Sequence, residues 1–280
     1  MKNILVIGSS GNVGRALTEE LVRSGERVRA GTRNASQWKA AEGVDPVQFD
    51  YNDPGTFAAA IEGSDRVFLI GPPTPTPHTV MIPFLKAATR DKRKVVLMTA
   101  MGTEFDDGSP LRQVELVLEH SGAPFVILRP NWFMDNFHTS WLAPLRQAGV
   151  IPLPAADSRT SLIDARDIGA SAAAALGTGR FDGRAFTLTG PEALTYAEAA
   201  ATLSKAAGRE IRYAAVDDES FVKSLVEAGA PADLARYLAV LFGFARQGAA
   251  APVSAGVEEL TGRAPRTLAQ YAKDHASAWR

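Results

Sequence analysis

The sequence predicts an α/β protein built on a doubly wound parallel sheet, with a smaller and mostly helical region towards its carboxyl end. Three observations lead to this prediction. An apolar run, Ile4 to Ile7, leads directly into a glycine-rich turn. Five strand-then-helix repeats follow within about the first 100 residues, a pattern typical of parallel sheets with helical crossovers. From residue 190 the pattern is mostly helical with short connections, which indicates a region covering one edge of the sheet.

Apolar periodicity, and the glycines and prolines that interrupt it, give the expected elements. Expected strands are residues 4–7, 27–32, 44–49, 66–70, 94–99, 124–128, 161–165 and 185–189. Expected helices are residues 15–24, 53–63, 78–89, 111–120 and 166–177. Thr195, with Glu198 three residues later, predicts a capping box at the start of a further helix.

The first strand runs into Gly8-Ser9-Ser10-Gly11-Asn12-Val13-Gly14, which we interpret as a turn and helix start that hold the diphosphate of a dinucleotide. Glycines lack a Cβ atom, so the backbone can adopt positive φ and approach the phosphates, whose charge then faces the positive end of the following helix. The motif alone is a weak signal, but here it follows a strand and opens a helix. We therefore expect a Rossmann-type cofactor domain.

Arg33, at the end of the second expected strand, bears on which dinucleotide is bound. Proteins that prefer NAD place an acid there to bond the ribose 2′-hydroxyl, whereas an arginine accommodates the 2′-phosphate of NADP. No acid occurs between Val28 and Asn34, and Arg33 lies 19 residues after Gly14. We expect NADP(H) to be preferred over NAD(H). The alternative is that Arg33 is only a solvated loop residue.

Residues at the ends of later strands would complete the crevice, because the carboxyl ends of parallel strands form the ligand edge of such a sheet. Asp50 follows the third strand, where it could meet the adenine amine or equally support a turn. Gly71-Pro72 follow the fourth strand, and Thr99-Ala100 end the fifth.

At 280 residues the chain is long enough for a large domain with a smaller appendage. We assign residues 1–130 to the NADP-binding domain, with residues 155–189 contributing to the same sheet. Residues 131–154 and 190–280 are assigned to a smaller substrate-binding or lid region.

The composition argues against several classes of protein. There are 30 basic and 31 acidic residues and no basic block, whereas dedicated binders of nucleic acids or anionic membranes carry a basic excess. The first apolar run is too short for a signal peptide or a membrane span, so we expect a cytoplasmic protein.

The residue types also restrict the chemistry. Without cysteine, redox chemistry must come from a cofactor. The four histidines show no metal spacing, and no metal site is expected. The oligomeric state is left open, a homodimer included.

An aromatic segment lies just beyond the sixth expected strand. Such a segment most often forms core, but in this position it could equally line an apolar pocket for the substrate. His138 lies beside it, either as a proton donor or as an ordinary helix-face residue. The candidate pocket residues are Trp132, Phe133, Met134, Phe137 and Trp141.

Together these residues carry a resemblance to a known family. Over roughly residues 1–205 the chain resembles the NmrA-like branch of the atypical short-chain dehydrogenase/reductase superfamily. That branch includes quinone reductases, triphenylmethane dye reductases and nucleotide-sensing regulators. The resemblance rests on the glycine turn, Arg33, Asp50-Tyr51, Thr99 to Gly102, Glu115 to Asn136 and Ile163 to Ile168. The cofactor-binding residues that it implies are Gly8, Ser10, Gly11, Asn12, Val13 and Gly14 around the diphosphate and ribose, Arg33 at the 2′-phosphate, Asp50 and Tyr51 on the adenine side, and Gly71, Pro72, Thr99, Ala100, Pro130, Asn131 and Phe133 around the nicotinamide.

The sequence departs from the wider superfamily at the catalytic helix. Ordinary members use Tyr-x-x-x-Lys, in which the lysine lowers the tyrosine pKa so that the phenol can exchange a proton with the substrate. This chain has no such motif, and the corresponding helix reads Leu111-Arg112-Gln113-Val114-Glu115. Arg112 could steady a phosphate or an oxyanion, but an arginine does not release a proton near neutral pH. The catalytic residue is unassigned, with Arg112 and His138 as candidates.

Three functions fit these observations to different degrees. The first is an NADPH-dependent reductase of a quinone-like or other conjugated small molecule, which accepts hydride without needing that acid. The second is a non-catalytic NADP sensor that reports its occupancy to a protein partner. The third, nucleotide-sugar epimerase chemistry, normally depends on the missing tyrosine and is disfavoured.

Overall fold

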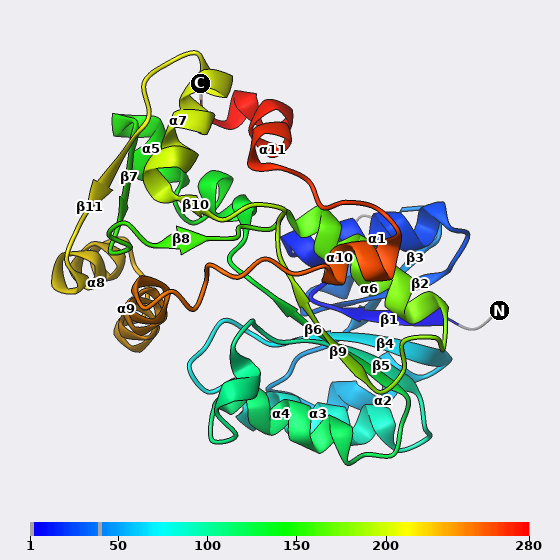
Figure 1. Ribbon diagram of the computed structural model, residues 1–280. Coiled ribbons are helices and arrows are strands. Elements are labelled where there is room, and N and C mark those ends of the chain that lie inside the picture. Colours follow the sequence, from blue (N-terminus) through cyan, green and yellow to red (C-terminus); the bar gives the residue numbers. More distant parts are fainter. Residues whose placement is uncertain (1–2, 39–40, 280) are drawn as a thin grey trace. The chain divides into compact units, whose positions relative to one another are not determined.

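The computed structural model describes residues 3–38 and 41–279, and its main feature is the predicted parallel sheet (Figure 1). Its seven strands run in the order β3-β2-β1-β4-β5-β6-β9, with every neighbouring pair parallel. The strand order reverses between β1 and β4, the point at which doubly wound sheets bind dinucleotides. The strands are β1 (Asn3–Ile7), β2 (Val28–Thr32), β3 (Val44–Gln48), β4 (Ser64–Ile70), β5 (Lys94–Met98), β6 (Phe125–Pro130) and β9 (Arg184–Leu188).

Helices cover both faces of this sheet. Figure 1 shows α1, α6 and α10 on one face and α2, α3 and α4 on the other. The strands between them are buried on both sides, so they read as continuous apolar runs, and Ile4 to Ile7 are at most 2% exposed. The helices are α1 (Asn12–Arg23), α2 (Phe57–Ile61), α3 (His78–Thr89), α4 (Pro110–Glu119), α6 (Ala165–Gly177) and α10 (Gly256–Thr261).

The contact between α1 and α6 depends on a glycine. A Cβ atom at Gly169 would lie 2.7 Å from the backbone nitrogen of Leu17, so only glycine lets the two helices approach this closely. Leu17 and Leu21 of α1 are buried on the side that faces the sheet layer. The close contact therefore joins the middle of α1, at Ala16 and Leu17, to α6.

Two expectations from the sequence are wrong, one about the strand-then-helix repeats and one about a strand. Between β2 and β3 the described residues form only the 3-10 helix η1 (Ala35–Gln37) and no α-helix, so one of the five strand-then-helix repeats is incomplete. Residues 161–165 are not a strand either. The Ser161 N–H donates to the Ala250 carbonyl, the Ser161 carbonyl accepts from Gly190, and Ile163 pairs with residues 132–134. The backbone groups are thus divided among three separate segments, and no continuous ladder forms.

The chain divides into two compact units. The first comprises residues 1–130, 165–188 and 256–263, and the second comprises residues 131–164, 189–255 and 264–280. The first therefore holds the whole seven-stranded sheet. Compared with the assignment made from sequence, residues 155–164 lie in the second unit and residues 256–263 in the first.

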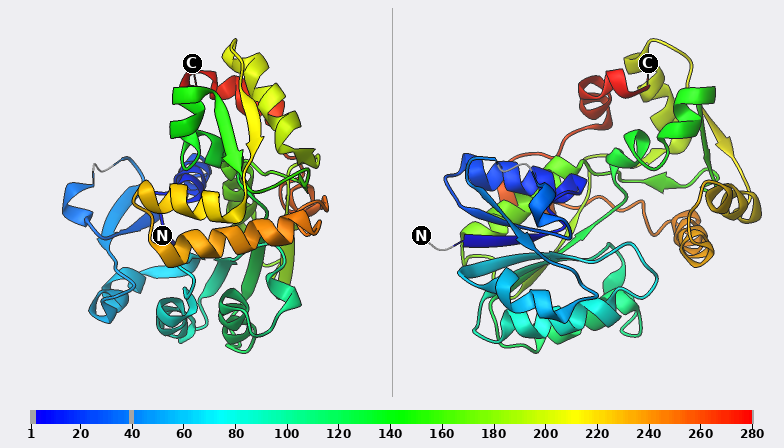
Figure 2. Two further views of the ribbon diagram at one scale, coloured as in Figure 1. Left: turned by 90° about the vertical axis from the view of Figure 1, so that its left-hand side faces the viewer. Right: turned by 180° about the vertical axis from the view of Figure 1, so that it is seen from behind.

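The second unit is mostly helical, with two small pairs of strands. β7 pairs in parallel with β11, and β8 pairs antiparallel with β10. The capping box predicted at Thr195 and Glu198 is confirmed at the start of α7. The left view of Figure 2 shows α8 and α9 side by side. The elements are η4 (Met134–His138), α5 (Leu142–Ala148), β7 (Val150–Leu153), β8 (Arg159–Thr160), β10 (Leu194–Thr195), α7 (Tyr196–Ala207), β11 (Arg212–Ala215), α8 (Asp218–Glu227), α9 (Ala232–Arg246), α11 (Leu268–Asp274) and η5 (Ala276–Trp279).

No helix in the described part of the chain has the length and apolar character needed to cross a membrane.

Candidate cofactor site

The turn between β1 and α1 has the backbone geometry of a phosphate cradle. Gly8 has a φ of +78°, and a Cβ atom there would lie 2.5 Å from the Ile70 side chain. The Gly11 N–H donates to the Gly8 carbonyl at 3.0 Å, which closes the turn. The Ser9 hydroxyl, which is buried, donates to the Gly31 carbonyl and ties the turn to β2.

The start of α1 lies directly against this turn. A Cβ atom at Gly14 would lie 2.1 Å from the Gly8 carbonyl oxygen, so no other residue fits without a backbone shift. Gly11 caps the helix without a side-chain hydrogen bond, and the first turn of α1 contains no acidic residue. The first N–H groups of a helix have no partner within it, so they are available to an anion. The cradle that a Cβ would fill and the uncapped helix start fit a dinucleotide diphosphate.

Arg33 follows β2 at the same edge of the sheet, in a segment that is tied to β3. The Gln48 side chain donates to the Arg33 carbonyl at 2.9 Å and accepts from the Ala35 N–H at 3.5 Å. The Arg33 side chain is exposed and has no hydrogen-bond or ion-pair partner among the residues that the structure describes. An anchored backbone with an unengaged guanidinium is suited to a phosphate ligand.

Asp50 and Tyr51 lie just after β3, and both take part in contacts within the first unit. The Asp50 carboxylate accepts the Asn52 N–H at 2.9 Å, so it supports a turn, which is one of the two expectations from sequence. The Tyr51 hydroxyl donates to the Ile70 carbonyl at 2.6 Å, and burial raises the pKa of this phenol well above its usual range. Their contact with adenine stays a prediction.

The ends of β4, β5 and β6 form the other half of this edge. A Cβ atom at Gly71 would lie 2.5 Å from the Met81 sulfur, so any other residue at the end of β4 would require the Met81 side chain of α3 to shift. The Thr99 N–H donates to Leu128, and the Met101 N–H donates to Pro130, both at about 3.0 Å, so the segment after β5 continues beside β6. Ala100 and Pro72 are partly exposed beside these residues.

Glu115 of α4 is the centre of a buried network at the end of β5. Its carboxylate, fully buried, accepts the Thr99 hydroxyl at 2.7 Å. The Arg129 guanidinium, through Nε and Nη2, makes a two-pronged contact with it at 3.0 and 2.7 Å, and Arg112 adds a bond at 2.9 Å. Burial raises the pKa of the Glu115 carboxyl, but the bonds from Arg129 and Thr99 outweigh that effect, and the net pKa is lowered.

This lowered pKa predicts how stability responds to acid. A carboxyl whose pKa is lower in the folded state than in the unfolded state stabilises the folded protein. This contribution is fully present at pH values above the unfolded pKa of about 4.3, and it is lost as the pH falls through the folded pKa. The free energy of unfolding should be higher for the wild type than for Glu115→Gln. This difference should be constant from neutral pH to about pH 5 and should shrink below about pH 4. Urea unfolding of both proteins across this range measures the difference. Parallel pH profiles would contradict this role of Glu115.

Arg112, a candidate for steadying an oxyanion, is engaged by carboxylates. It contacts Asp107 at 3.0 Å, Glu115 at 2.9 Å and Glu119 at 2.7 Å. The hydrogen bond to Glu119 is the largest effect that raises the pKa of this guanidinium. Its positive charge is thus compensated within α4 and the preceding loop, and its part in the chemistry stays a prediction.

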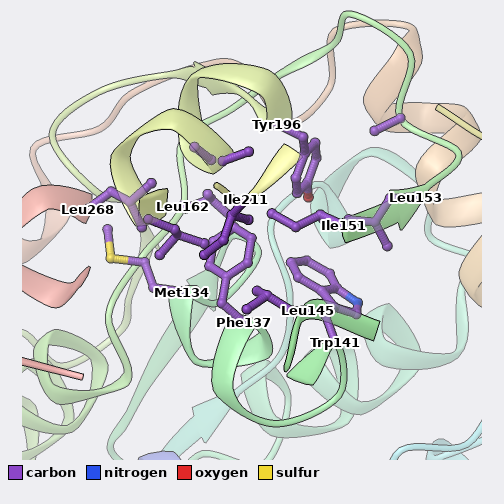
Figure 3. Packing of buried hydrophobic residues seen from close by; sticks show 14 of the residues in the cluster. Met134, Phe137, Trp141, Leu145, Ile151, Leu153, Leu162, Tyr196, Ile211 and Leu268 are labelled. Carbon is purple, nitrogen blue, oxygen red and sulfur yellow. The ribbon is translucent and has the colours of Figure 1, made fainter. Parts of the chain in front are cut away.

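The aromatic segment lies in the second unit and mostly forms core. Figure 3 shows Met134, Phe137 and Trp141 gathered with aliphatic residues and Tyr196 in one cluster. Met134 and Phe137 are at most 1% exposed, so their side chains have almost no surface for a ligand. Trp132 and Phe133 are partly exposed, and the Trp132 ring stacks on Phe242 with centroids 4.5 Å apart. Of the five candidate pocket residues, these two have side-chain surface to offer.

Asn131 and His138 are also held by contacts within the second unit. The Asn131 amide donates to Ser161 and to the Ala250 carbonyl, both at 2.8 Å, and accepts the Trp132 N–H. His138 is hydrogen-bonded to the Tyr271 hydroxyl and stacks on His275 with ring centroids 4.6 Å apart. Among the described residues, no group of three or more metal-ligating side chains comes together.

Two residues of the site were missed by sequence reasoning. Gln48 was read only as part of a strand, although its outward-facing position next to β2 could have suggested contact with the Arg33 segment. Glu115 was noted only within the resemblance. The signal for it was available: Glu115 is a carboxylate within the helix that follows the fifth strand, and Arg129 lies at the end of the next strand.

This fold and cradle define a Rossmann-type protein of the NAD(P)H-binding class. The model of a family described as NAD(P)H-binding matches residues 8–147, and that of the NmrA-like family matches residues 111–272. The chain belongs to the NmrA-like family, as its resemblance implied.

Similar proteins include both reductases and a protein named for a developmental process. The chain is 33% identical to an NAD(P)H azoreductase of Xenophilus azovorans, covering 99% of each chain. It is 34% identical to the prestalk A differentiation protein A of Dictyostelium discoideum, covering 97% of this chain and 92% of that one. The NADPH-dependent quinone oxidoreductase of Escherichia coli in complex with NADPH superposes with a TM-score of 0.82 at 25% identity, covering 97% of this chain and 99% of that one.

Proposed function

We propose that the protein is an NADPH-dependent reductase that transfers hydride to a quinone-like or other conjugated small molecule. The observation that supports this most is the pairing of a built diphosphate cradle with a helix that lacks the Tyr-x-x-x-Lys proton donor. The cradle comprises Gly8 with its positive φ and Gly14 with no room for a Cβ atom. The helix that follows β5 reads Leu111-Arg112-Gln113-Val114-Glu115 and contains no Tyr-x-x-x-Lys motif.

The residues of the first unit suit NADPH in its extended form. The N–H groups at the start of α1 would hold the diphosphate, and the Arg33 guanidinium would hold the 2′-phosphate. The ends of β4 and β5, on the far side of the reversal in strand order, would receive the nicotinamide half. Bound NADPH would supply the hydride.

The missing acid restricts the class of acceptor. A carbonyl that receives hydride becomes an alkoxide and needs a proton at once, whereas a quinone or a cationic dye spreads or cancels the charge within its own π system. Such an acceptor needs positioning more than proton transfer, and positioning can supply most of the rate enhancement. Trp132 and Phe133, which keep exposed surface, are our proposed contacts for a flat acceptor.

A screen of acceptors tests this function. NADPH oxidation is followed by the loss of its absorbance with quinones, azo dyes, triphenylmethane dyes and simple aldehydes. We expect turnover well above background with at least one of the conjugated classes and none with the aldehydes. Turnover of aldehydes alone, or of no acceptor, would refute the proposed reaction.

Arg33→Ala tests the cofactor preference. A lost hydrogen-bonded charge contact of about 1.5–3 kcal/mol corresponds to about a 10- to 100-fold weaker affinity for NADPH. NADH lacks the 2′-phosphate, so its affinity should hardly change, and titration of both cofactors measures the difference. Arg27→Ala is the matched control, because Arg27 precedes the same strand and only pairs with Asp45 at the surface. Unchanged affinity of Arg33→Ala for NADPH would refute the NADP assignment.

A second candidate function is an NADP sensor that does not turn over. It is favoured by the missing acid and by the three carboxylates that occupy Arg112. This candidate predicts tight NADP binding with no turnover of any acceptor, and a co-purifying protein whose retention depends on the nucleotide. Turnover in the acceptor screen would exclude it as the sole function.

A further inference from the structure

The direction of one buried hydrogen bond restricts what Thr99 can do. An ionised carboxylate has only acceptor atoms, and the bonds from Arg129 and Arg112 keep Glu115 in that form. The Thr99 hydroxyl has a single proton, so it must donate that proton to Glu115 in their bond of 2.7 Å. Thr99 therefore has no proton left to offer to a ligand.

The same geometry leaves Thr99 able to accept. Its hydroxyl oxygen has two lone pairs, and no N–H or O–H group in the described part of the chain donates to it. Thr99 is only 6% exposed, and its bond to Glu115 satisfies the hydroxyl as a donor while leaving its lone pairs free. The residue follows β5 directly, at the carboxyl edge of the sheet.

From these facts we infer that Glu115 is a positioning residue, which orients the Thr99 hydroxyl as a pure acceptor for the carboxamide N–H of the nicotinamide. The inference rests on the proposed function, because it places the nicotinamide half of NADP over the ends of β4 and β5. The carboxamide is the only N–H donor on the nicotinamide ring system. Accordingly, Thr99 does not replace the missing tyrosine as an acid.

The test compares three ligands by calorimetry in the absence of an acceptor. NADP carries the carboxamide, its 3-acetylpyridine analogue has a methyl group in place of the NH₂, and 2′-phospho-ADP-ribose lacks the ring. We expect wild type to bind NADP about two- to tenfold more tightly than the analogue, as for one hydrogen bond. Thr99→Val should remove this preference without changing the affinity for 2′-phospho-ADP-ribose. Thr99→Ser, which keeps the hydroxyl, should restore the preference.

The role of Glu115 has its own variant and control. In Glu115→Gln the amide can donate to Thr99, which reverses the bond and occupies the lone pair, so the preference for NADP over the analogue should fall. Arg112→Gln also removes one charge from the network but does not touch Thr99, and it should retain the preference. Circular dichroism and the affinity for 2′-phospho-ADP-ribose report whether each variant is folded.

The outcomes separate this inference from the proposed function. Equal affinity of wild type for NADP and the analogue, or an unchanged preference in Thr99→Val, would overturn the role of Thr99. Loss of the preference in Arg112→Gln as well as in Glu115→Gln would overturn the role of Glu115 in orienting it. If wild type binds none of the three ligands, the proposed cofactor function itself is wrong.

Discussion

Gly14→Ala is expected to lower the free energy of unfolding by about 3 kcal/mol or more and to weaken binding of NADPH. The added Cβ atom would lie 2.1 Å from the Gly8 carbonyl oxygen and 2.7 Å from the Ser9 Cα atom. Both are backbone atoms, so no side chain can rotate away, and α1 must move from the turn. That movement displaces the N–H groups that the diphosphate needs. Urea unfolding and NADPH titration measure the two effects.

Gly177→Ala is the matched control for this prediction. Gly177 is the last residue of α6, and a Cβ atom there would meet no other atom within 4 Å. The same substitution should leave stability unchanged or raise it by up to about 1 kcal/mol, because alanine restricts the unfolded chain. If Gly14→Ala behaves like Gly177→Ala, the turn and helix are not packed as described.

The second large effect is expected for Glu115→Ala, at about 3–5 kcal/mol of lost stability. Removing the carboxylate leaves the largely buried Arg129 with only Glu104, 3.5 Å away, and leaves Thr99 without an acceptor, whereas Arg112 keeps Asp107 and Glu119. An uncompensated buried charge costs more than the ion pair contributes, because the charge stays out of water. The measurement is chemical unfolding at neutral pH, where Glu115 is ionised.

Glu119→Ala provides the comparison on the same helix. Glu119 also contacts Arg112, at 2.7 Å, but it is partly exposed to solvent. Exposed ion pairs contribute about 0–1 kcal/mol, so this variant should be close to wild type. If Glu115→Ala and Glu119→Ala lose equal amounts of stability, burial is not the reason that Glu115 stabilises the fold.

The sheet and the cradle could be predicted from sequence because both are local signals. Ile4 to Ile7 form an apolar run that ends at a glycine, and glycine at positions 8 and 14 is required by φ and by close backbone contact. Each apolar strand could be predicted from its own residues, without information on the distant residues that it contacts. The element boundaries were accurate for α3, where His78 and Thr89 are the observed ends.

The rest depended on contacts between residues that are far apart in the chain. Glu115 looks like a helix-surface residue until Thr99 and Arg129 are brought to it. Residues 161–165 have the composition of a strand, but their backbone partners belong to three separate segments. For the aromatic segment, core and pocket share one hydrophobic pattern, so only burial could distinguish Phe137 from Trp132.

The division of the chain into units has a consequence for fragments. The backbone passes from one unit to the other five times, after residues 130, 164, 188, 255 and 263. Because of this, no single cut yields the cofactor-binding unit intact. A truncation at residue 255 would remove α10, whose Gly256 comes so close to Thr187 that a Cβ atom would lie 2.2 Å from its carbonyl oxygen. The first unit is therefore complete only when the chain extends through residue 263, so most of the chain must be synthesised before this unit can assemble in full.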